Sequence, residues 1–179
     1  RDRVLLVART VDALIDAQKE IEAKGGQASI FPCDLNDMNA IDDVSKQILD
    51  SVDHIDILIN NAGRSIRRAV HESTDRFHDF ERTMQLNYFG AVRLILNILP
   101  QMMSRRQGQI INISSIGVFA NATRFSAYVA SKAALDAFSR CLSAEVDSHK
   151  IAITSIYIPL VRTPMIAPTK IYKYVPALT

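Results

Sequence analysis

Gln109-Ile-Ile-Asn-Ile-Ser-Ser115 indicates the fold class, together with the helical segment 126–146 and the apolar run 151–158 that follow it. A short apolar run such as 109–113 is typical of a strand buried within a sheet. A helix between two such runs predicts a βαβ unit, in which the two strands are parallel. Ser115 then lies at the carboxyl end of its strand, where open α/β sheets bind their ligands.

The same alternation of strands and helices extends over the rest of the chain. Further strands are predicted at 4–8, 27–32 and 55–59, and further helices at 11–23, 38–52 and 83–103. This order predicts an α/β fold with a doubly wound parallel sheet covered by helices on both faces. Because 179 residues with 48% hydrophobic content can bury one sizeable core, residues 1–179 are predicted to form a single domain.

Tyr128 and Lys132 lie four residues apart in Ala127-Tyr-Val-Ala-Ser-Lys132, within the predicted helix 126–146. This spacing places the phenol and the ammonium on one helix face. An ammonium near a phenol favours the phenolate, so we expect the pKa of Tyr128 to fall below its usual value of about 10. The pair therefore indicates acid/base chemistry on a carbonyl group. A packed ring beside a solvated lysine is the alternative interpretation.

Three further motifs accompany this pair in a fixed order. Asn60-Asn-Ala-Gly63 closes the strand 55–59, Asn87 lies in the helical Met84-Gln-Leu-Asn-Tyr-Phe-Gly90, and Ser115 precedes Tyr128 by thirteen residues. With Tyr-x-x-x-Lys, these motifs resemble the short-chain dehydrogenase/reductase family over nearly the whole chain. The resemblance implies a Rossmann-like fold and a catalytic set. Its members would be Asn87, Ser115, Tyr128 and Lys132.

Within that family, the chain is most similar to bacterial fatty acyl-CoA reductases, which make fatty aldehydes for wax ester synthesis. The stretches that carry this similarity are Gly63-Arg-Ser-Ile-Arg-Arg68, Asp75-Arg-Phe-His-Asp-Phe-Glu81 and Tyr157-Ile-Pro-Leu-Val-Arg-Thr-Pro-Met165. The resemblance implies reduction of long-chain fatty acyl-CoA with NADPH. Two alternatives stay open, because the catalytic set does not distinguish a thioester: a ketone or aldehyde reductase of the same family, and a non-catalytic cofactor-binding fragment.

The Gly-rich turn that the family uses to bind the pyrophosphate does not occur in this sequence. The motif register makes 4–8 the family's second strand, so the family's first strand would lie between it and the strand 55–59. An empty slot about 4.8 Å wide would leave two rows of backbone groups unpaired. We therefore expect a protein that lacks its first and last strands, with residues missing before Arg1 and after Thr179, and that folds poorly alone.

The prediction of the cofactor depends mainly on Arg9, which follows the strand 4–8. NAD enzymes place a carboxylate at this point, whereas a guanidinium can bind a 2′-phosphate, so Arg9 favours NADPH. A solvated arginine at a helix start is the alternative. Asp34 resembles the family's adenine-contacting aspartate, although it would also serve as an N-cap for the helix 38–52. The other predicted cofactor-binding residues are Leu35, Asn61, Ala62, Gly63, Tyr128, Lys132, Pro159, Val161 and Thr163.

One departure from the family pattern affects the last three of these residues. Leu160 replaces the glycine of the Pro-Gly-x-Val-x-Thr segment, and leucine does not readily adopt a positive φ angle. Val161 and Thr163 remain in place, so the nicotinamide contacts are still expected there.

Substrate phosphates are predicted to bind the arginine cluster Arg64, Arg67 and Arg68, or Lys170 and Lys173. The lysines belong to the proline-rich tail 163–179, which is expected to be a loop or lid. A solvated charged face is the alternative interpretation of both sets.

The composition limits the other function classes. A formal net charge of +2 gives no reason to expect nucleic acid as a partner. The most apolar long stretch, 91–103, is shorter than the roughly 20 residues that span a bilayer. Cys33 and Cys141 lack metal-like spacing, so a reduced, cytoplasmic protein without metal is predicted. The helices that begin at Thr83 and Ser126 resemble those that build family dimers and tetramers, which implies a homo-oligomer.

Overall fold

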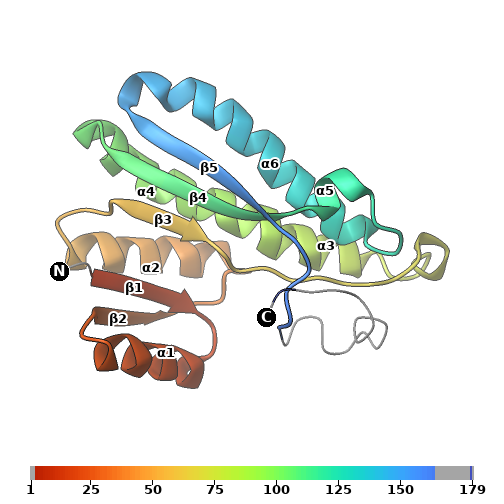
Figure 1. Cartoon of the computed structure of the whole chain (residues 1–179), viewed down its shortest axis with the longest axis horizontal. Coiled ribbons are helices and arrows are strands. Elements are labelled where there is room, and N and C mark those ends of the chain that lie inside the picture. The colour runs from red at the N-terminus through yellow and green to blue at the C-terminus, as the bar shows by residue number, and fades with distance from the viewer. Residues whose placement is uncertain (1–2, 164–177, 179) are drawn as a thin grey trace.

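The computed structural model of the chain describes residues 3–163 and 178 and shows the predicted alternation of strands and helices (Figure 1). The parallel α/β fold is therefore confirmed. The strands are β1 (Arg3–Ala8), β2 (Gln27–Pro32), β3 (Ile57–Asn60), β4 (Gly108–Ser115) and β5 (Ile151–Ile158). The helices are α1 (Val11–Ala23), α2 (Met38–Ser51), α3 (His78–Met84), α4 (Ala91–Arg105), α5 (Gly117–Ala120) and α6 (Ser126–Val146).

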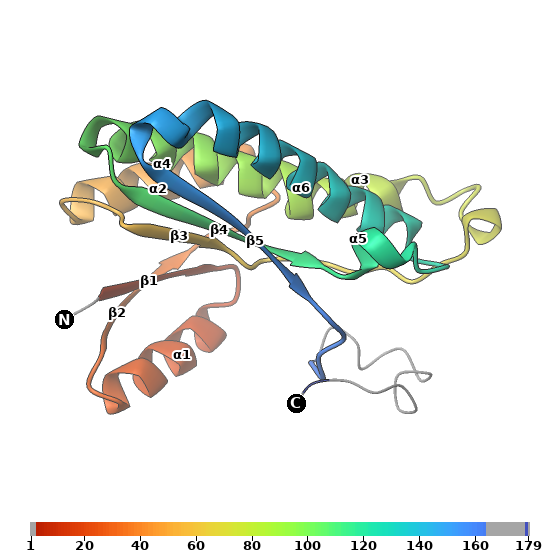
Figure 2. The ribbon, with the colours of Figure 1, turned by 45° about the horizontal axis from the view of Figure 1, so that its top comes forward.

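The five strands form two separate parallel sheets, one of β1 and β2 and one in the order β3–β4–β5. The separation falls between β1 and β3, where the sequence predicts a slot for the family's first strand. Figures 1 and 2 show the β1–β2 pair lying beside β3. In the described part of the chain, neither β1 nor β3 has a hydrogen-bonded strand on the edge that faces the other.

One face of the β3–β4–β5 sheet carries the hydrophobic core. Helices α2, α4 and α6 lie on this face, whereas α1 lies on the opposite side of the molecule against β1 and β2 (Figure 2). Ile95, Met102 and Ile110 are fully buried where α4 meets β4, and Ile41 is fully buried on α2. Burial alternates along β4 because of this packing: Ile110, Asn112 and Ser114 point to the helices and are buried.

The other face of this sheet is apolar and largely exposed. Ile57 and Ile59 on β3 are 52% and 57% exposed, and Ile156 on β5 is 42% exposed. The register places them on one side, because Ile59 pairs with Ile111 and Ile113 pairs with Ile156. Chain elements as apolar as these are normally covered by another layer.

Amide exchange within β3 should report the open edge directly. Gln109 N–H donates to Asp56 C=O at 2.8 Å, so the alternation of a parallel ladder turns Leu58 toward β4 and Ile57 and Ile59 away from it. We expect the Leu58 amide to exchange at least about tenfold more slowly than the amides of Ile57 and Ile59. Hydrogen exchange followed by NMR measures this. Equal protection of the three amides would contradict the open edge.

The central helix differs from the predicted 83–103. It begins at His78, and a π-helical turn at Gln85–Gly90 joins α3 to α4. Gly90 permits this path, because a Cβ added there would overlap the Leu35 carbonyl oxygen. A 3₁₀ turn at Val70–Glu72 and the short α5 were also not predicted, and β3 begins at Ile57 rather than at Ile55.

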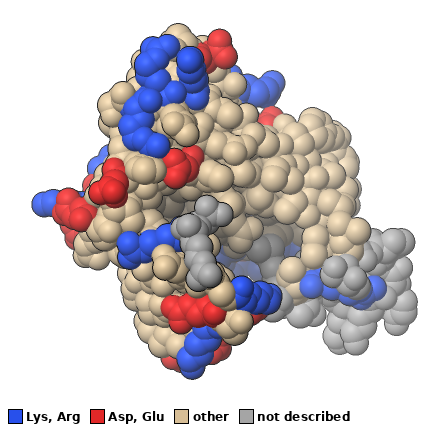
Figure 3. All heavy atoms as spheres, turned by 60° about the vertical axis from the view of Figure 1, so that its left-hand side comes forward, with Lys and Arg blue, Asp and Glu red and all other residues tan. Residues whose placement is uncertain are grey.

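The surface shows no single-signed charge patch on the face in Figure 3, where basic and acidic side chains are interspersed. This agrees with the small formal net charge of +2. Among the described residues, none of the helices combines the length and the apolar character needed to cross a bilayer.

Candidate active site

Ser115 and Tyr128 form a hydroxyl pair at the carboxyl end of β4. Ser115 is the last residue of β4, and its Oγ accepts a hydrogen bond from the Gly117 amide at 3.1 Å. Tyr128 lies in the first turn of α6. Burial raises the pKa of Tyr128 above its usual value, while its hydrogen bond with Ser115 lowers that pKa by less.

The expectation that Lys132 lowers the pKa of Tyr128 is wrong in this structure, because burial outweighs every opposing effect. The ammonium is instead directed to the backbone, where Nζ donates to the Ile113 carbonyl oxygen at 2.7 Å. Lys132 is only 4% exposed. Its burial lowers the pKa of its own ammonium to about 8.

Asn87 joins the loop after β3 to α6. Its Oδ1 accepts the Arg64 amide at 2.7 Å, and its Nδ2 donates to the Arg64 carbonyl at 2.8 Å and to Ser131 Oγ at 2.9 Å. The π-helical turn brings this side chain inward, where it is 1% exposed. These bonds use both amide protons, so Asn87 fixes the position of the loop relative to α6.

Gly63 brings the predicted motifs into one site. A Cβ added at Gly63 would lie 3.5 Å from Asn87 Oδ1 and 3.6 Å from Lys132 Nζ. The loop backbone therefore runs directly against two predicted catalytic side chains, and a larger side chain here would crowd both. Asn61 and Ala62, which precede it, are exposed at the end of β3.

A buried polar chain behind the site was missed by the sequence analysis. Asn60 Nδ2 donates to Asn112 Oδ1 at 2.8 Å, and Asn112 Nδ2 donates to Ser139 Oγ at 2.8 Å. These bonds tie the ends of β3 and β4 to α6, which carries Tyr128. A polar residue inside an apolar run, such as Asn112 in 109–113, was the available signal.

Arg9, Asp34 and Arg64 gather at the carboxyl ends of β1 and β2. Hydrogen bonds from Asn36 lower the pKa of Asp34 most; burial opposes this, and the charges of Arg9 and Arg64 lower it further. The N-cap alternative for Asp34 is wrong, because Asp37 caps α2 by accepting the Asn39 and Ala40 amides. Asp34 instead accepts the Asn36 amide in a local turn at 3.0 Å.

The loop that contains Asp34 and Leu35 is fixed against the helix of Asn87. Gln85 Nε2 donates to the Asn36 carbonyl at 2.8 Å, and the Leu35 carbonyl packs against Gly90. The two sides of the predicted cofactor site are thereby connected through one helix. Neither Gln85 nor Gly90 was predicted from the sequence as a site residue.

The third predicted cofactor segment follows β5. Pro159 and Thr163 are exposed, and Val161 forms a β-bridge with Leu178. Arg162 N–H donates to the Leu178 carbonyl at 2.9 Å. Ile116 N–H donates to the Ile158 carbonyl at 3.2 Å, which places this segment next to the end of β4.

The three arginines predicted to bind substrate lie in different surroundings. Arg64 lies near Asp34, and Arg67 is exposed. Arg68 Nε contacts Asp79 Oδ2 at 3.1 Å, and Arg76 and Arg82 contact the same buried carboxylate. The guanidinium of Arg68 is thus already paired. Lys170 and Lys173, with nearly all of the predicted loop or lid 163–179, lie outside the described residues.

Comparison with known proteins places this site in context. The chain is 81% identical to an Acinetobacter baylyi protein named fatty acyl-CoA reductase, over 98% of this chain and 60% of the relative. A Mycobacterium tuberculosis protein with the same name is 51% identical, over 98% of this chain and 60% of that protein. The chain thus spans about three fifths of the length of these relatives.

Solved structures and a family match agree on the class of protein. A short-chain dehydrogenase from Streptomyces avermitilis has a TM-score of 0.82 at 35% identity, over 92% of this chain and 59% of that one. A metagenomic short-chain oxidoreductase in complex with NADP has a TM-score of 0.82 at 28% identity, over 90% of this chain and 70% of that one. The short chain dehydrogenase family matches residues 2–171. The chain belongs to this short-chain dehydrogenase family.

Proposed function

We propose that this chain carries the catalytic site of an NADPH-dependent reductase that converts long-chain fatty acyl-CoA to fatty aldehyde. The observation that carries the proposal is the Ser115–Tyr128 hydroxyl pair at the end of β4, beside the buried Lys132 and Asn87. The thioester substrate is inferred from the 81% identical relative, which is named fatty acyl-CoA reductase.

In this mechanism, Tyr128 acts as general acid and Ser115 stabilises the developing negative charge. The hydride for the thioester carbon would come from a nicotinamide cofactor when it is bound. Tyr128 donates its proton to the carbonyl oxygen, and Ser115 donates a hydrogen bond to the same oxygen. The raised pKa of Tyr128 keeps the phenol protonated near neutral pH, as a general acid requires. The resulting hemithioacetal breaks its carbon–sulfur bond to release coenzyme A and the aldehyde.

The residues present fit the nicotinamide and adenosine ends of a nicotinamide dinucleotide at the carboxyl ends of the strands, whereas the Gly-rich turn for its pyrophosphate does not occur in this sequence. Gly63 gives the loop backbone close access to Asn87 and Lys132, and the exposed Asn61 and Ala62 continue this edge. Lys132 would contact the nicotinamide ribose, and Asp34 the adenine. Arg9 is exposed next to Asp34 and would bind a 2′-phosphate, which is why NADPH is proposed over NADH.

The test is cofactor oxidation with palmitoyl-CoA, a fatty aldehyde or a ketone as acceptor. We expect NADPH oxidation with palmitoyl-CoA, formation of aldehyde, and a much lower rate with NADH. The assay should use this chain alone and the chain joined to the remaining part of the Acinetobacter baylyi relative, because the chain covers 60% of that protein. Turnover of the ketone alone would establish a different reductase. Cofactor binding without turnover of any acceptor would establish a binding protein.

Two further properties are proposed for the longer protein. Phe89 and Leu96 on the central helix are about half exposed, which supports association of this helix with a second copy in a dimer or tetramer. Both cysteines are free, Cys33 buried and Cys141 exposed. Free thiols support a reducing, cytoplasmic location.

A further inference from the structure

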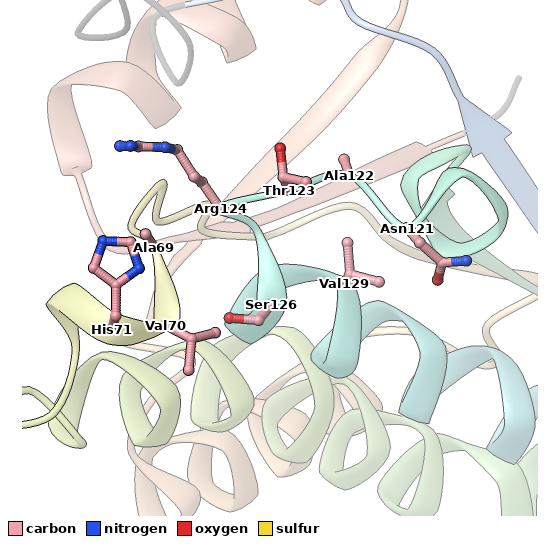
Figure 4. A pocket seen from close by; sticks show the side chains of 9 residues that line it. All are labelled: Ala69, Val70, His71, Asn121, Ala122, Thr123, Arg124, Ser126 and Val129. Atoms are coloured by element: carbon pink, nitrogen blue, oxygen red, sulfur yellow. The ribbon is translucent and has the colours of Figure 1, made fainter.

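A pocket of about 540 Å³ lies at the start of α6, where Val129 of its wall follows Tyr128 in the sequence. Its walls come from two loop segments, 69–71 after β3 and 121–126 before α6, and from the first turn of α6 (Figure 4). The side chains of Val70 and Val129 point into the space between these segments, and Arg124 and His71 lie at one end of it. This volume is typical of small-molecule sites.

The pocket reaches the reacting centre through Val129, which follows Tyr128 in α6. A Cβ added at Gly117 would lie 3.5 Å from a Val129 methyl group and 3.2 Å from Ser115 Oγ. One wall of the pocket therefore lies across Gly117 from the catalytic serine. A substrate whose carbonyl contacts Ser115 and Tyr128 has this wall within reach of the atoms next to the carbonyl.

The charged groups at the rim are paired with one another. Arg124 Nη1 lies 3.7 Å from Glu72 Oε2, and His71 Nε2 lies 3.9 Å from the other oxygen of Glu72. Arg124 is held in a left-handed conformation with φ of 70°, and its carbonyl accepts the Arg68 amide at 2.7 Å. Because Arg124 and Glu72 balance in charge, the rim offers no excess charge to attract a phosphate.

The interior offers apolar surface instead. Val70 is 64% exposed although it lines the pocket with Ala122 and Val129. Apolar side chains left open beside a polar reacting centre fit an apolar ligand segment attached to a carbonyl.

We propose that this pocket binds the fatty acyl chain of the thioester next to the reacting carbonyl, and that Val70, Ala122 and Val129 contact its methylene groups. This inference rests on the proposed acyl-CoA reductase function. Each methylene group that enters the pocket should strengthen binding by up to about fourfold, because it leaves water. The chain therefore selects long acyl groups by the surface of this pocket.

Ala122→Phe tests the proposal, because Ala122 is exposed and its replacement fills the pocket without disturbing the core. Ala120→Phe is the matched control, since Ala120 is also exposed and does not line the pocket. In the chain joined to the remaining part of the Acinetobacter relative, we expect Ala122→Phe to raise the KM for palmitoyl-CoA about tenfold. The KM for butyryl-CoA should change less than about twofold, and the control should change neither.

Val70→Asp provides a second variant on the opposite wall, with Val70→Ala as its control. A carboxylate there should weaken the binding of palmitoyl-CoA about tenfold, since burial of a charge beside methylene groups is unfavourable. Binding of the fluorescent fatty acid cis-parinaric acid to the same joined chain gives a readout without turnover. Both Ala122→Phe and Val70→Asp should weaken it relative to their controls.

The acyl pocket and the reductase function would be contradicted by different results. Palmitoyl-CoA turnover with the same KM in Ala122→Phe and Ala120→Phe would overturn the acyl pocket and leave the reductase function standing. Absence of turnover would overturn the reductase function. In that case, equal parinaric acid binding by all four variants would overturn the pocket as well, and selective loss in Ala122→Phe and Val70→Asp would support it.

Discussion

Tyr128→Phe is expected to lower kcat for reduction of palmitoyl-CoA by about 1,000-fold, which corresponds to about 4 kcal/mol of transition-state stabilisation. The phenol is the acidic group paired with Ser115 at the end of β4, and phenylalanine keeps the ring and removes only the hydroxyl group. Since the change leaves Lys132 and Gly63 in place, NADPH binding should stay within about twofold. Stopped-flow measurement of NADPH oxidation and fluorescence titration of NADPH separate these two quantities.

Tyr157→Phe is the matched control for this experiment. The hydroxyl of Tyr157 on β5 donates to the buried Asp136 on α6, and neither residue belongs to the proposed catalytic set. Its removal should leave kcat within about twofold. If Tyr128→Phe kept a rate similar to that of Tyr157→Phe, another group would have to protonate the substrate, and the role proposed for Tyr128 would be excluded.

The site could be placed from the sequence because it depends on where strands end. Strand ends at Asn60 and Ser115 are visible as polar residues after apolar runs, and parallel strands bring their carboxyl ends to one edge. The helix 126–146 was predicted with the boundaries that the structure has, so Tyr128 and Lys132 could be placed on one helix. These are local patterns that tertiary packing did not override.

The interactions within the site could not be predicted in the same way. The path of Asn87 depends on a π-helical turn, and this turn depends on a contact between Gly90 and the carbonyl of Leu35, 55 residues earlier in the chain. Likewise, spacing placed Lys132 near Tyr128 but carried no information on burial, which sets the pKa of both groups. Arg68 was predicted to bind substrate phosphates, but the sequence did not show that its guanidinium pairs with the buried Asp79.

The division of the sheet was predictable for a topological reason. The order in which the motifs follow one another assigns β1 and β3 to positions on either side of the family's first strand. The structure places these two strands in separate sheets, with apolar side chains exposed on β3. The proposed catalytic residues lie on β4, α6 and the π-helical turn, all within the part that packs around one core. Their mutual geometry therefore does not require strand pairing across the division.

Burial of the charged Lys132 should lower the free energy of unfolding near neutral pH. This destabilisation should decrease as the pH rises. Burial lowers the pKa of its ammonium from the usual 10.5 to about 8. Below pH 8, the folded and unfolded chains both carry the charge, and the folded chain bears its full desolvation cost. Between pH 8 and about 10.5, the unfolded chain binds more protons, so the contribution of Lys132 to the free energy of unfolding rises with pH. The shift corresponds to about 3 kcal/mol.

Lys132→Met is therefore expected to increase the free energy of unfolding by about 2 kcal/mol at pH 7 while it abolishes reduction. Loss of the hydrogen bond to the Ile113 carbonyl offsets about 1 kcal/mol of the gain. The difference between the variant and the unsubstituted chain should shrink from pH 8 upward, reach zero near about pH 9.5 and reverse to about −1 kcal/mol by about pH 10.5, because the neutral amine keeps its hydrogen bond. Urea unfolding at pH 7 and at pH 9.5 measures it, with Lys46→Met on the exposed side of α2 as the control that should leave the pH dependence unchanged. A variant less stable than the unsubstituted chain at pH 7 would show that Lys132 supports the fold, whereas the expected gain would mean that this buried charge is retained at the expense of stability.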